Sequence, residues 1–284
     1  MTLGTIGSAV KACGILTLWL TLSGCATAPL MTSGSLVAYN ELTPADGITT
    51  KSKLHIDKPG ILAARSISIV PARYSAAATT AELSDQQRRI IANAIDRSLC
   101  IGLSDRFQIV PFGAPADLTV RSTITHLTIT NAALAGASKV ASIAPNFIAG
   151  GSPVPIPRIP LGMGSLSVEA EAISVNRQQK AAFVWARGAD FLSSTPRVSA
   201  SGDAYDLASE FGADFSKLLV TAESPFKKSL SLPAMHRVQS TLGGQPKEAV
   251  CDVFGRSGIA SLVAGKLGAP PEWNDDAMPV AANP

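Results

Sequence analysis

The sequence predicts an α+β fold, a two-layer sandwich in which two amphipathic helices cover one face of a mostly antiparallel sheet. Residues 166–191 contain two alternating segments around a polar turn, which is typical of a β-hairpin with antiparallel strands. Two further segments, beginning at Ser84 and at residue 203, repeat apolar residues at helical spacing. Because each helix has a single apolar face, both are expected to pack on the same side of the sheet.

The N-terminus has the pattern of a lipoprotein signal peptide. Lys11 supplies a basic residue, residues 14–22 are nearly all apolar, and small residues ending at Gly24 precede Cys25. About a dozen apolar residues are too few for a transmembrane helix, which takes about 20. We expect cleavage after Gly24, the alternative being ordinary secretion with cleavage elsewhere.

Cys25 would then be the first mature residue and the site of lipid attachment. Its thiol can carry diacylglycerol and its amino group a third acyl chain, and two or more chains suffice for stable membrane anchoring. Ala26, by analogy with enterobacterial sorting, favours the outer membrane. We therefore expect a signal peptide over residues 1–24 and a lipidated N-terminus with a short tether over residues 25–34, in the bacterial envelope and facing the periplasm.

The composition indicates one folded domain, which we place at residues 35–223. The chain is 46% hydrophobic and 16% charged, and its 19 prolines predict several irregular segments. Loss of 24 residues from 284 leaves 260, and loss of Lys11 leaves 23 basic against 21 acidic side chains. Because basic and acidic side chains are nearly equal in number, the charge gives no indication of nucleic-acid binding.

The domain begins with an extended segment over residues 35–42 and a strand over residues 66–72. Ser84 then opens a helix, because it forms a capping box with Gln87, and the helix is expected to end within residues 102–105. Its apolar face repeats every four residues, at Ile91, Ile95 and Leu99. The polar side chains expected to face water are Arg88, Asp96 and Arg97.

Two strands are expected next, at residues 107–110 and 117–130. The second is rich in β-branched residues, but its apolar parity changes near His126, which predicts a bulge or a change of buried face.

The hairpin has strands at residues 166–173 and 181–191. Folding about its turn predicts that Glu169 or Glu171 approaches Arg187 across the strands.

The last long helix of the domain covers residues 203–220. Its apolar stripe consists of Leu207, Phe211, Phe215, Leu218 and Leu219. A C-terminal extension, residues 224–268, has apolar residues at helical spacing that predict a short docked helix: Phe254, Ile259, Leu262 and Val263. Residues 269–284 are expected to form a flexible tail.

Residues 131–164 are an apolar, Gly- and Pro-rich insertion whose only charges are Lys139 and Arg158. We expect a long loop whose proline-rich part, residues 151–160, runs extended or as polyproline II. The insertion either covers one end of the core or contacts a partner or the membrane. The candidate partner surface consists of Phe147, Ile156 and Ile159.

Cys100 and Cys251 remain once Cys13 leaves with the signal and Cys25 takes lipid. In an oxidising periplasm two such thiols predict a disulfide, which would contribute about 2–4 kcal/mol to stability. The alternative is two unpaired buried cysteines.

The sequence offers no catalytic constellation, so we expect no enzyme activity, cofactor or metal. The three histidines are far apart and lack metal-ligand spacing: His55, His126 and His236. Residues 162–165 match neither a phosphate loop nor a serine elbow, and they are expected to form the bend that enters a strand. Glu169 and Glu171 share a strand face and would serve as acid and base in a hydrolase, although a solvated or ion-paired face is the commoner arrangement.

Several segments resemble those of a known family. Besides the lipobox that ends at Cys25, they are residues 33–42 (SGSLVAYNEL), 116–120 (ADLTV), 168–172 (VEAEA) and 208–215 (ASEFGADF). Through them the chain resembles, from about Ser33 to Leu219, the uncharacterised bacterial lipoprotein family catalogued as domain of unknown function thirty-three thirteen. The resemblance implies an envelope lipoprotein without an established activity, and it transfers no catalytic residue.

We therefore expect a lipid-anchored, periplasm-facing binding or scaffolding module. Its expected partners are the membrane, through the N-terminal lipid, and an envelope protein. The alternatives are an envelope-polymer hydrolase and a carrier of an apolar ligand beneath residues 131–164.

Overall fold

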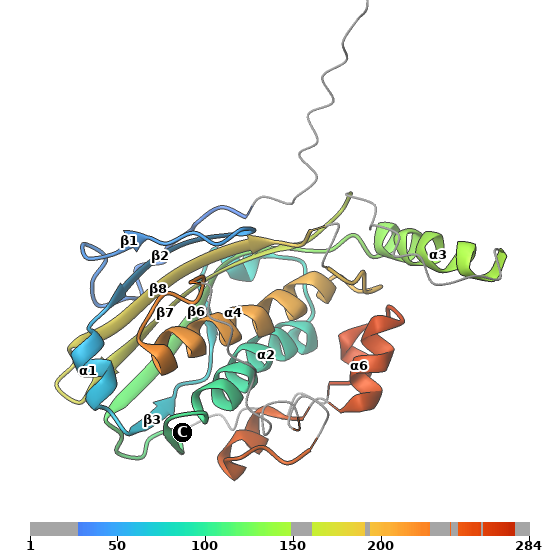
Figure 1. Ribbon diagram of the computed structural model, residues 1–284. Helices are drawn as coiled ribbons and strands as arrows, with labels where there is room; N and C mark the ends of the chain where they lie inside the picture. The colour runs from blue at the N-terminus through green and yellow to red at the C-terminus, as the bar shows by residue number, and fades with distance from the viewer. Residues whose placement is uncertain are drawn as a thin grey trace, which may run out of the picture.

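One eight-stranded sheet organises the domain, in the order β1–β2–β8–β7–β6–β3–β5 with β4 beside β6 (Figure 1). The structure is a computed structural model that describes residues 28–148, 161–190, 194–227, 239, 244–256 and 258–275, with the backbone alone for residues 141–148. The strands are β1 (Thr43–Pro44), β2 (Thr50–Ile56), β3 (Ser66–Ile69), β4 (Arg73–Tyr74), β5 (Gln108–Val110), β6 (Leu118–Thr128), β7 (Ser165–Ser174) and β8 (Gln179–Gly188).

Strand pairing is antiparallel from β1 through β2, β8 and β7 to β6. It is parallel where β3 lies beside β5 and β6, and where β4 lies beside β6. Adjacent parallel strands need a crossover connection, and helix α2 (Asp85–Leu103) provides it between β3 and β5. The mostly antiparallel sheet confirms the predicted α+β fold.

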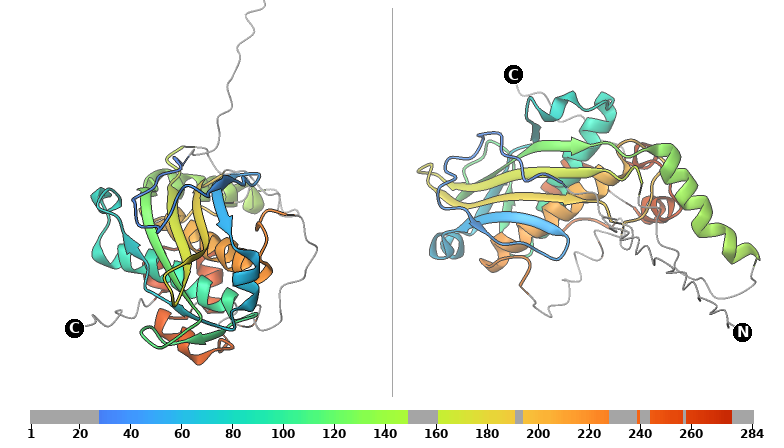
Figure 2. Two further views of the ribbon diagram at one scale, coloured as in Figure 1. Left: turned by 90° about the vertical axis from the view of Figure 1, so that its left-hand side faces the viewer. Right: turned by 90° about the horizontal axis from the view of Figure 1, so that it is seen from above.

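Helices α2 and α4 (Gly202–Thr221) pack against each other and together cover one face of the sheet, as predicted (Figures 1 and 2). The other helical elements are α1 (Lys58–Ala63), α3 (Ala132–Ile148), α6 (Ile259–Lys266) and the 3₁₀ turns η1 (Ala78–Thr80), η2 (Ala249–Phe254) and η3 (Pro271–Trp273). Within the described residues, no helix is long and apolar enough to cross a membrane.

The start and the apolar face of α2 are as predicted. The Ser84 hydroxyl accepts a hydrogen bond from the Gln87 amide, and the Gln87 side chain accepts one from the Ser84 amide, which completes the capping box. The apolar residues Ile91, Ile95 and Leu99 are fully buried.

The prediction that Asp96 and Arg97 face water is wrong, because both side chains are buried. The backbone amide of Ala72 donates to both Asp96 carboxylate oxygens, at 3.0 and 3.1 Å. Arg97 pairs at 2.7 Å with Asp275, which follows the C-terminal extension. The sequence around α2 gives no indication of this second covering layer, so helical periodicity alone leaves the two residues on the outside.

Aromatic side chains join the sheet to α4. Phe183 of β8 lies 6.0 Å from Phe211 and 5.9 Å from Phe215, measured between ring centroids. Trp185 meets Phe211 edge-on, and its indole N–H donates to Asp214 at 2.9 Å. The predicted stripe of α4 therefore lies in the core between the two layers.

The hairpin β7–β8 and the irregularity in β6 are both confirmed. The register between β6 and β7 shifts between Ile124 and His126, where the parity of the sequence changes. The bend predicted for residues 162–165 lies at residues 161 and 162, and β7 begins at Ser165. Arg177 takes a left-handed conformation, φ 58°, in the hairpin turn.

Several elements differ from the sequence expectation, among them β2 and α3. Strand β2 was missed, because its buried positions include the small polar residues Thr50 and Ser52, which weaken the alternating apolar signal. Residues 132–148 form helix α3 where a loop was expected, and the high helix propensity of its alanines accounts for this. The polyproline prediction for residues 151–160 lies outside the described residues.

The C-terminal extension is attached to α2 by a disulfide between Cys100 and Cys251, with Cα atoms 5.7 Å apart. The contact is made by η2, where Cys251 and Phe254 are buried. Helix α6 exists, but its predicted apolar face docks only in part: Leu262 lines a cavity with residues of α2 and α4, whereas Ile259 is 59% and Val263 52% exposed.

Residues 269–275 pack on the domain, which differs from the flexible tail expected to begin at Ala269. Asp275 is buried against Arg97, and the Tyr205 hydroxyl donates to it at 2.6 Å. Glu272 accepts hydrogen bonds from Ser199 and Ser201. These polar contacts fix the segment, whereas its composition alone resembles a tail. Residues 276–284 lie outside the described residues.

Candidate functional site

The face of the sheet opposite α2 and α4 is covered by residues 28–42, which we call the strap. It runs along β7 from the start of that strand: the Pro29 carbonyl accepts from Ser167 at 2.6 Å, and the Met31 carbonyl accepts from Thr125 at 2.9 Å. Farther on, Leu36 packs on Ala182 and Val184 of β8 to form a small apolar cluster. The sheet is therefore buried on both faces over β7 and β8.

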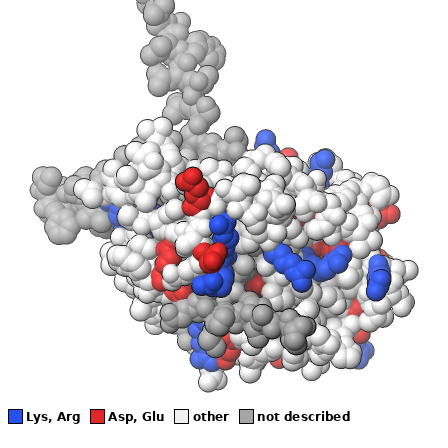
Figure 3. Space-filling model, turned by 180° about the vertical axis from the view of Figure 1, so that it is seen from behind, with Lys and Arg blue, Asp and Glu red and all other residues white. Residues whose placement is uncertain are grey.

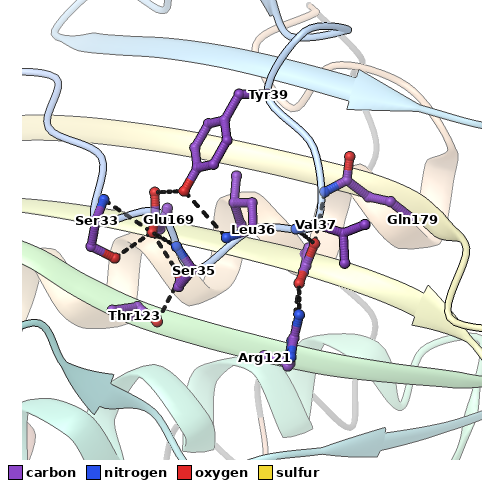
Figure 4. A network of polar contacts seen from close by, with 10 residues as sticks. Ser33, Ser35, Leu36, Val37, Tyr39, Arg121, Thr123, Glu169 and Gln179 are labelled. Atoms are coloured by element: carbon purple, nitrogen blue, oxygen red, sulfur yellow. Dashed lines mark hydrogen bonds and ion pairs between the residues drawn. The ribbon is translucent and has the colours of Figure 1, made fainter.

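Glu169 is the centre of this contact and is fully buried (Figure 4). One carboxylate oxygen accepts from the amide and hydroxyl of Ser33, at 3.2 and 2.5 Å, and from those of Ser35, at 3.0 and 2.7 Å. The other oxygen accepts from the Tyr39 hydroxyl at 2.9 Å. The strap thus supplies five donors to one carboxylate.

Glu171, two residues along the same strand face, makes a second contact with the strap. Its carboxylate accepts from the Val37 amide at 2.8 Å and from Gln179 at 2.7 Å. It also forms an ion pair and hydrogen bonds with Arg121 of β6. Because Arg121 is 43% exposed, this pair is partly screened by solvent.

The donors around Glu169 determine its protonation. Burial alone would raise the pKa of its carboxyl, but the hydrogen bonds from Ser33, Ser35 and Tyr39 outweigh burial and lower the pKa below its ordinary value of 4.5. Burial, aided by the bond to Glu169, raises the pKa of the Tyr39 hydroxyl to about 12. Glu169 is thus ionised and Tyr39 neutral at physiological pH.

The predicted approach of Glu169 or Glu171 to Arg187 is wrong. In the hairpin register Glu169 lies opposite Val184 and Glu171 opposite Ala182, whereas Arg187 lies opposite Leu166. Neighbouring positions of a strand point to opposite faces, so Arg187 is on the helix side of the sheet. There it pairs with Asp190 at 3.2 Å and with Glu210 at 2.7 Å.

The histidines and acidic residues do not assemble a metal site within the described part of the chain. His55 contacts Glu41 at 3.2 Å, and His126 contacts Thr128 at 3.2 Å. His236 lies outside the described residues.

The helix side of the domain has a cavity of about 310 Å³ between α2, α4 and α6. Much of its wall consists of small residues, among them Ala94, Ser98, Gly102, Ala213 and Ser216. Two other cavities, of about 300 and 240 Å³, lie near Arg187 and Arg197. None of these three is lined by the described residues of the 131–164 insertion.

Several predicted site residues fall where the structure gives no side-chain description. The predicted cleavage and lipidation site, Gly24 and Cys25, lies outside the described residues, as do Ile156 and Ile159. Phe147 belongs to α3, whose backbone is described there. The predicted disulfide of Cys100 and Cys251 is present.

The family described as "Protein of unknown function (DUF3313)" matches residues 31–215. The chain belongs to this family. The match includes both sides of the strap contact, from Ser33 to Tyr39 and from Glu169 to Glu171, and it excludes Cys251 and Asp275. The predicted membership is thereby confirmed, and the family description names no activity.

No curated protein matches the chain. Among solved structures, the dodecamers of a PelC L103M variant and of PelC, both from Paraburkholderia phytofirmans, are 10% and 12% identical, with TM-scores of 0.31 and 0.33. The alignments cover 61% and 58% of this chain and 93% and 95% of those chains. Protein XCC0632 from Xanthomonas campestris is 10% identical, with a TM-score of 0.30 and coverage of 56% and 85%. Similarity this low supports no conclusion about function.

The role of the strap was missed because its partners are far away in sequence. Ser33 and Glu169 are 136 residues apart, and no local pattern connects them. One signal could have indicated a cover: residues 181–186 of β8 are apolar at every position, which is typical of a strand buried on both faces.

Proposed function

We propose that this protein is a lipid-anchored envelope module that holds a binding or scaffolding domain against the membrane. The docked strap is the observation that carries the proposal. Its first described residue, Ala28, is buried, and it follows Cys25 by three residues, which span about 10 Å at most. A lipid on Cys25 would therefore keep the sheet next to the bilayer, with little free tether between them.

The strap contact also supports binding over catalysis. A general acid or base needs a carboxyl that a substrate can reach. Both carboxylates of the hydrolase alternative are buried under the strap and accept hydrogen bonds from the chain itself. Glu169 and Glu171 are therefore better explained as the residues that hold the strap.

The mixed charge on the surface favours a partner that does not bind through a large patch of one charge. Seen from behind, acidic and basic side chains lie next to one another in mixed groups. Wide areas without charged side chains separate these groups (Figure 3). Charge of a single sign would be needed to attract a polyelectrolyte over such a surface. An envelope protein or the membrane itself fits this face better than nucleic acid.

The anchor is tested by a Cys25→Ala variant expressed beside the wild type. We expect the wild type to float with membranes and to show the mass of a lipid-modified N-terminal peptide, and the variant to lose both properties. A wild type without lipid mass, or a variant that floats as well as the wild type, would contradict the proposal. Circular dichroism of the variant serves as the control for folding.

A further inference from the structure

Helix α3 leaves the domain at the end of the sheet where the strap begins. Thr128 of β6, Ser165 of β7 and Gly188 of β8 are paired in one row across this end. Helix α3 begins four residues after Thr128, and the strap crosses the same end through the Pro29–Ser167 contact. The base of α3 and the first described residues of the strap therefore share one end of the domain.

The first half of α3 is attached on one side only. Ala135 and Ser138 are buried, the Lys139 ammonium donates to the carbonyl of Lys266, and Gly136 faces Val198. On its other side, Ala133 and Ala137 are exposed and Val140 is 68% exposed. Beyond this base the helix projects from the sheet (Figures 1 and 2).

The exposed side is apolar, and its spacing is that of one helix face. Ala133, Ala137 and Val140 are separated by four and three residues. Residues 131–164 contain no acidic residue, so anionic headgroups would not be repelled. With 17 residues, α3 is shorter than the about 20 needed to span a bilayer, whereas a helix with one apolar face can lie in the bilayer surface.

We propose that the exposed face of α3 is a membrane-binding surface that lies in the headgroup region beside the lipid anchor. The inference rests on the proposed anchor, because the three residues from Cys25 to Ala28 bring this end of the sheet within about 10 Å of the bilayer. A helix of 17 residues is about 25 Å long, so it reaches the surface from its base. Lipid and helix together would fix the orientation of the domain, whereas lipid alone would leave it free to turn.

The test places an environment-sensitive fluorophore on Val140→Cys in the full, lipidated protein, reconstituted in phosphatidylethanolamine–phosphatidylglycerol vesicles. The matched control is Val175→Cys, since Val175 is 74% exposed and follows β7 at the opposite end of the sheet. The native disulfide leaves Cys100 and Cys251 unavailable to the label. We expect a blue shift at position 140 and loss of its emission on addition of nitroxide lipid, with neither change at position 175.

Equal emission and quenching at the two positions in protein that floats with the vesicles would overturn the membrane surface while leaving the anchor intact. A shift seen only in native envelope membranes and not in pure lipid would overturn it in favour of a protein partner. Failure of the wild type to float would overturn the anchor and this inference together. Because Val140 is exposed, a folding defect is not expected, and circular dichroism checks this.

Discussion

At the scale of single residues, the ionisation of Glu169 makes the stability of the strap contact depend on pH. Its pKa is lowered in the folded protein, so it contributes stability above the ordinary value of 4.5, and that stability is lost as pH falls through the folded-state pKa. Below this range the protonated carboxyl can no longer accept every hydrogen bond that the strap offers. Acidic pH should therefore loosen the strap before the core.

The first prediction concerns Glu169→Gln. An amide in place of the carboxylate would point an N–H₂ group at strap donors, and we expect a loss of about 1.5–3 kcal/mol in the free energy of unfolding. Urea denaturation measures the loss, and hydrogen exchange should accelerate at the amides of Ser35 and Val37.

The matched control is Glu41→Gln. Glu41 also lies on the strap, but its side chain is 59% exposed in its pair with His55, so the change should stay within about 1 kcal/mol. The difference between wild type and Glu169→Gln should shrink as pH falls below 4.5. A difference that stays constant with pH would show that the charge of Glu169 does not hold the strap.

The ionisation of Asp96 changes stability with pH in the direction opposite to that of Glu169. Burial raises the pKa of its carboxyl to about 8, although the hydrogen bond from the Ala72 amide lowers it in part. The folded state therefore keeps a proton that the unfolded state loses near pH 4, so stability falls as pH rises from about 4 toward 8. Above pH 8 the ionisation of Asp96 causes no further loss of stability.

The second prediction is that Asp96→Asn removes this pH dependence. An amide keeps the acceptor for the Ala72 amide and cannot ionise. The stability of the wild type relative to the variant should fall by up to about 4 kcal/mol between pH 5 and pH 8. Denaturation midpoints at both pH values measure the change, and a relative stability independent of pH would mean that Asp96 ionises normally in the folded state.

At the scale of elements, the C-terminal extension and the segment 269–275 that follows it are fixed to α2 at two points. The disulfide holds η2, and the Arg97–Asp275 pair holds the segment after η3. Removing the partner of a buried charge is costly, so the ion pair alone should retain part of this contact when the disulfide is absent.

A Cys100→Ser, Cys251→Ser double variant tests this arrangement. We expect it to lose about 2–4 kcal/mol of stability, because the disulfide no longer constrains the unfolded chain. Hydrogen exchange should increase in η2 and remain unchanged in the strap, which lies on the other face of the sheet. Unchanged protection of η2 would mean that packing alone holds the extension.

At the scale of the whole molecule, segments from the two ends of the chain cover opposite sides of the domain. The strap covers the sheet face opposite α2 and α4, and the C-terminal extension covers α2. The proposed anchor and the exposed face of α3 both belong to one end of the sheet, so a single orientation toward the bilayer satisfies them. The remaining surface, including the cavity of about 310 Å³ beside α6, would then face the periplasm.

The elements that have a clear period or a local signal could be predicted from the sequence. These were helices α2 and α4, the β7–β8 hairpin, the bulge near His126 and the capping box of Ser84. The sequence also predicted the Cys100–Cys251 disulfide, because compartment and an even cysteine count left a single pairing. Helical and strand periodicities arise from backbone geometry within a few residues, so they can be read without a fold.

The identity of the buried polar residues and of their partners, by contrast, depends on the tertiary fold. Asp96, Arg97, Glu169 and Glu171 occupy positions that look solvent-exposed in their own elements. Each is covered by a residue or segment distant along the chain, and the strap reaches Glu169 across 136 residues. Burial of a charged side chain depends on hydrogen-bond partners brought in by the fold, and because those partners are not its sequence neighbours, no local pattern records them.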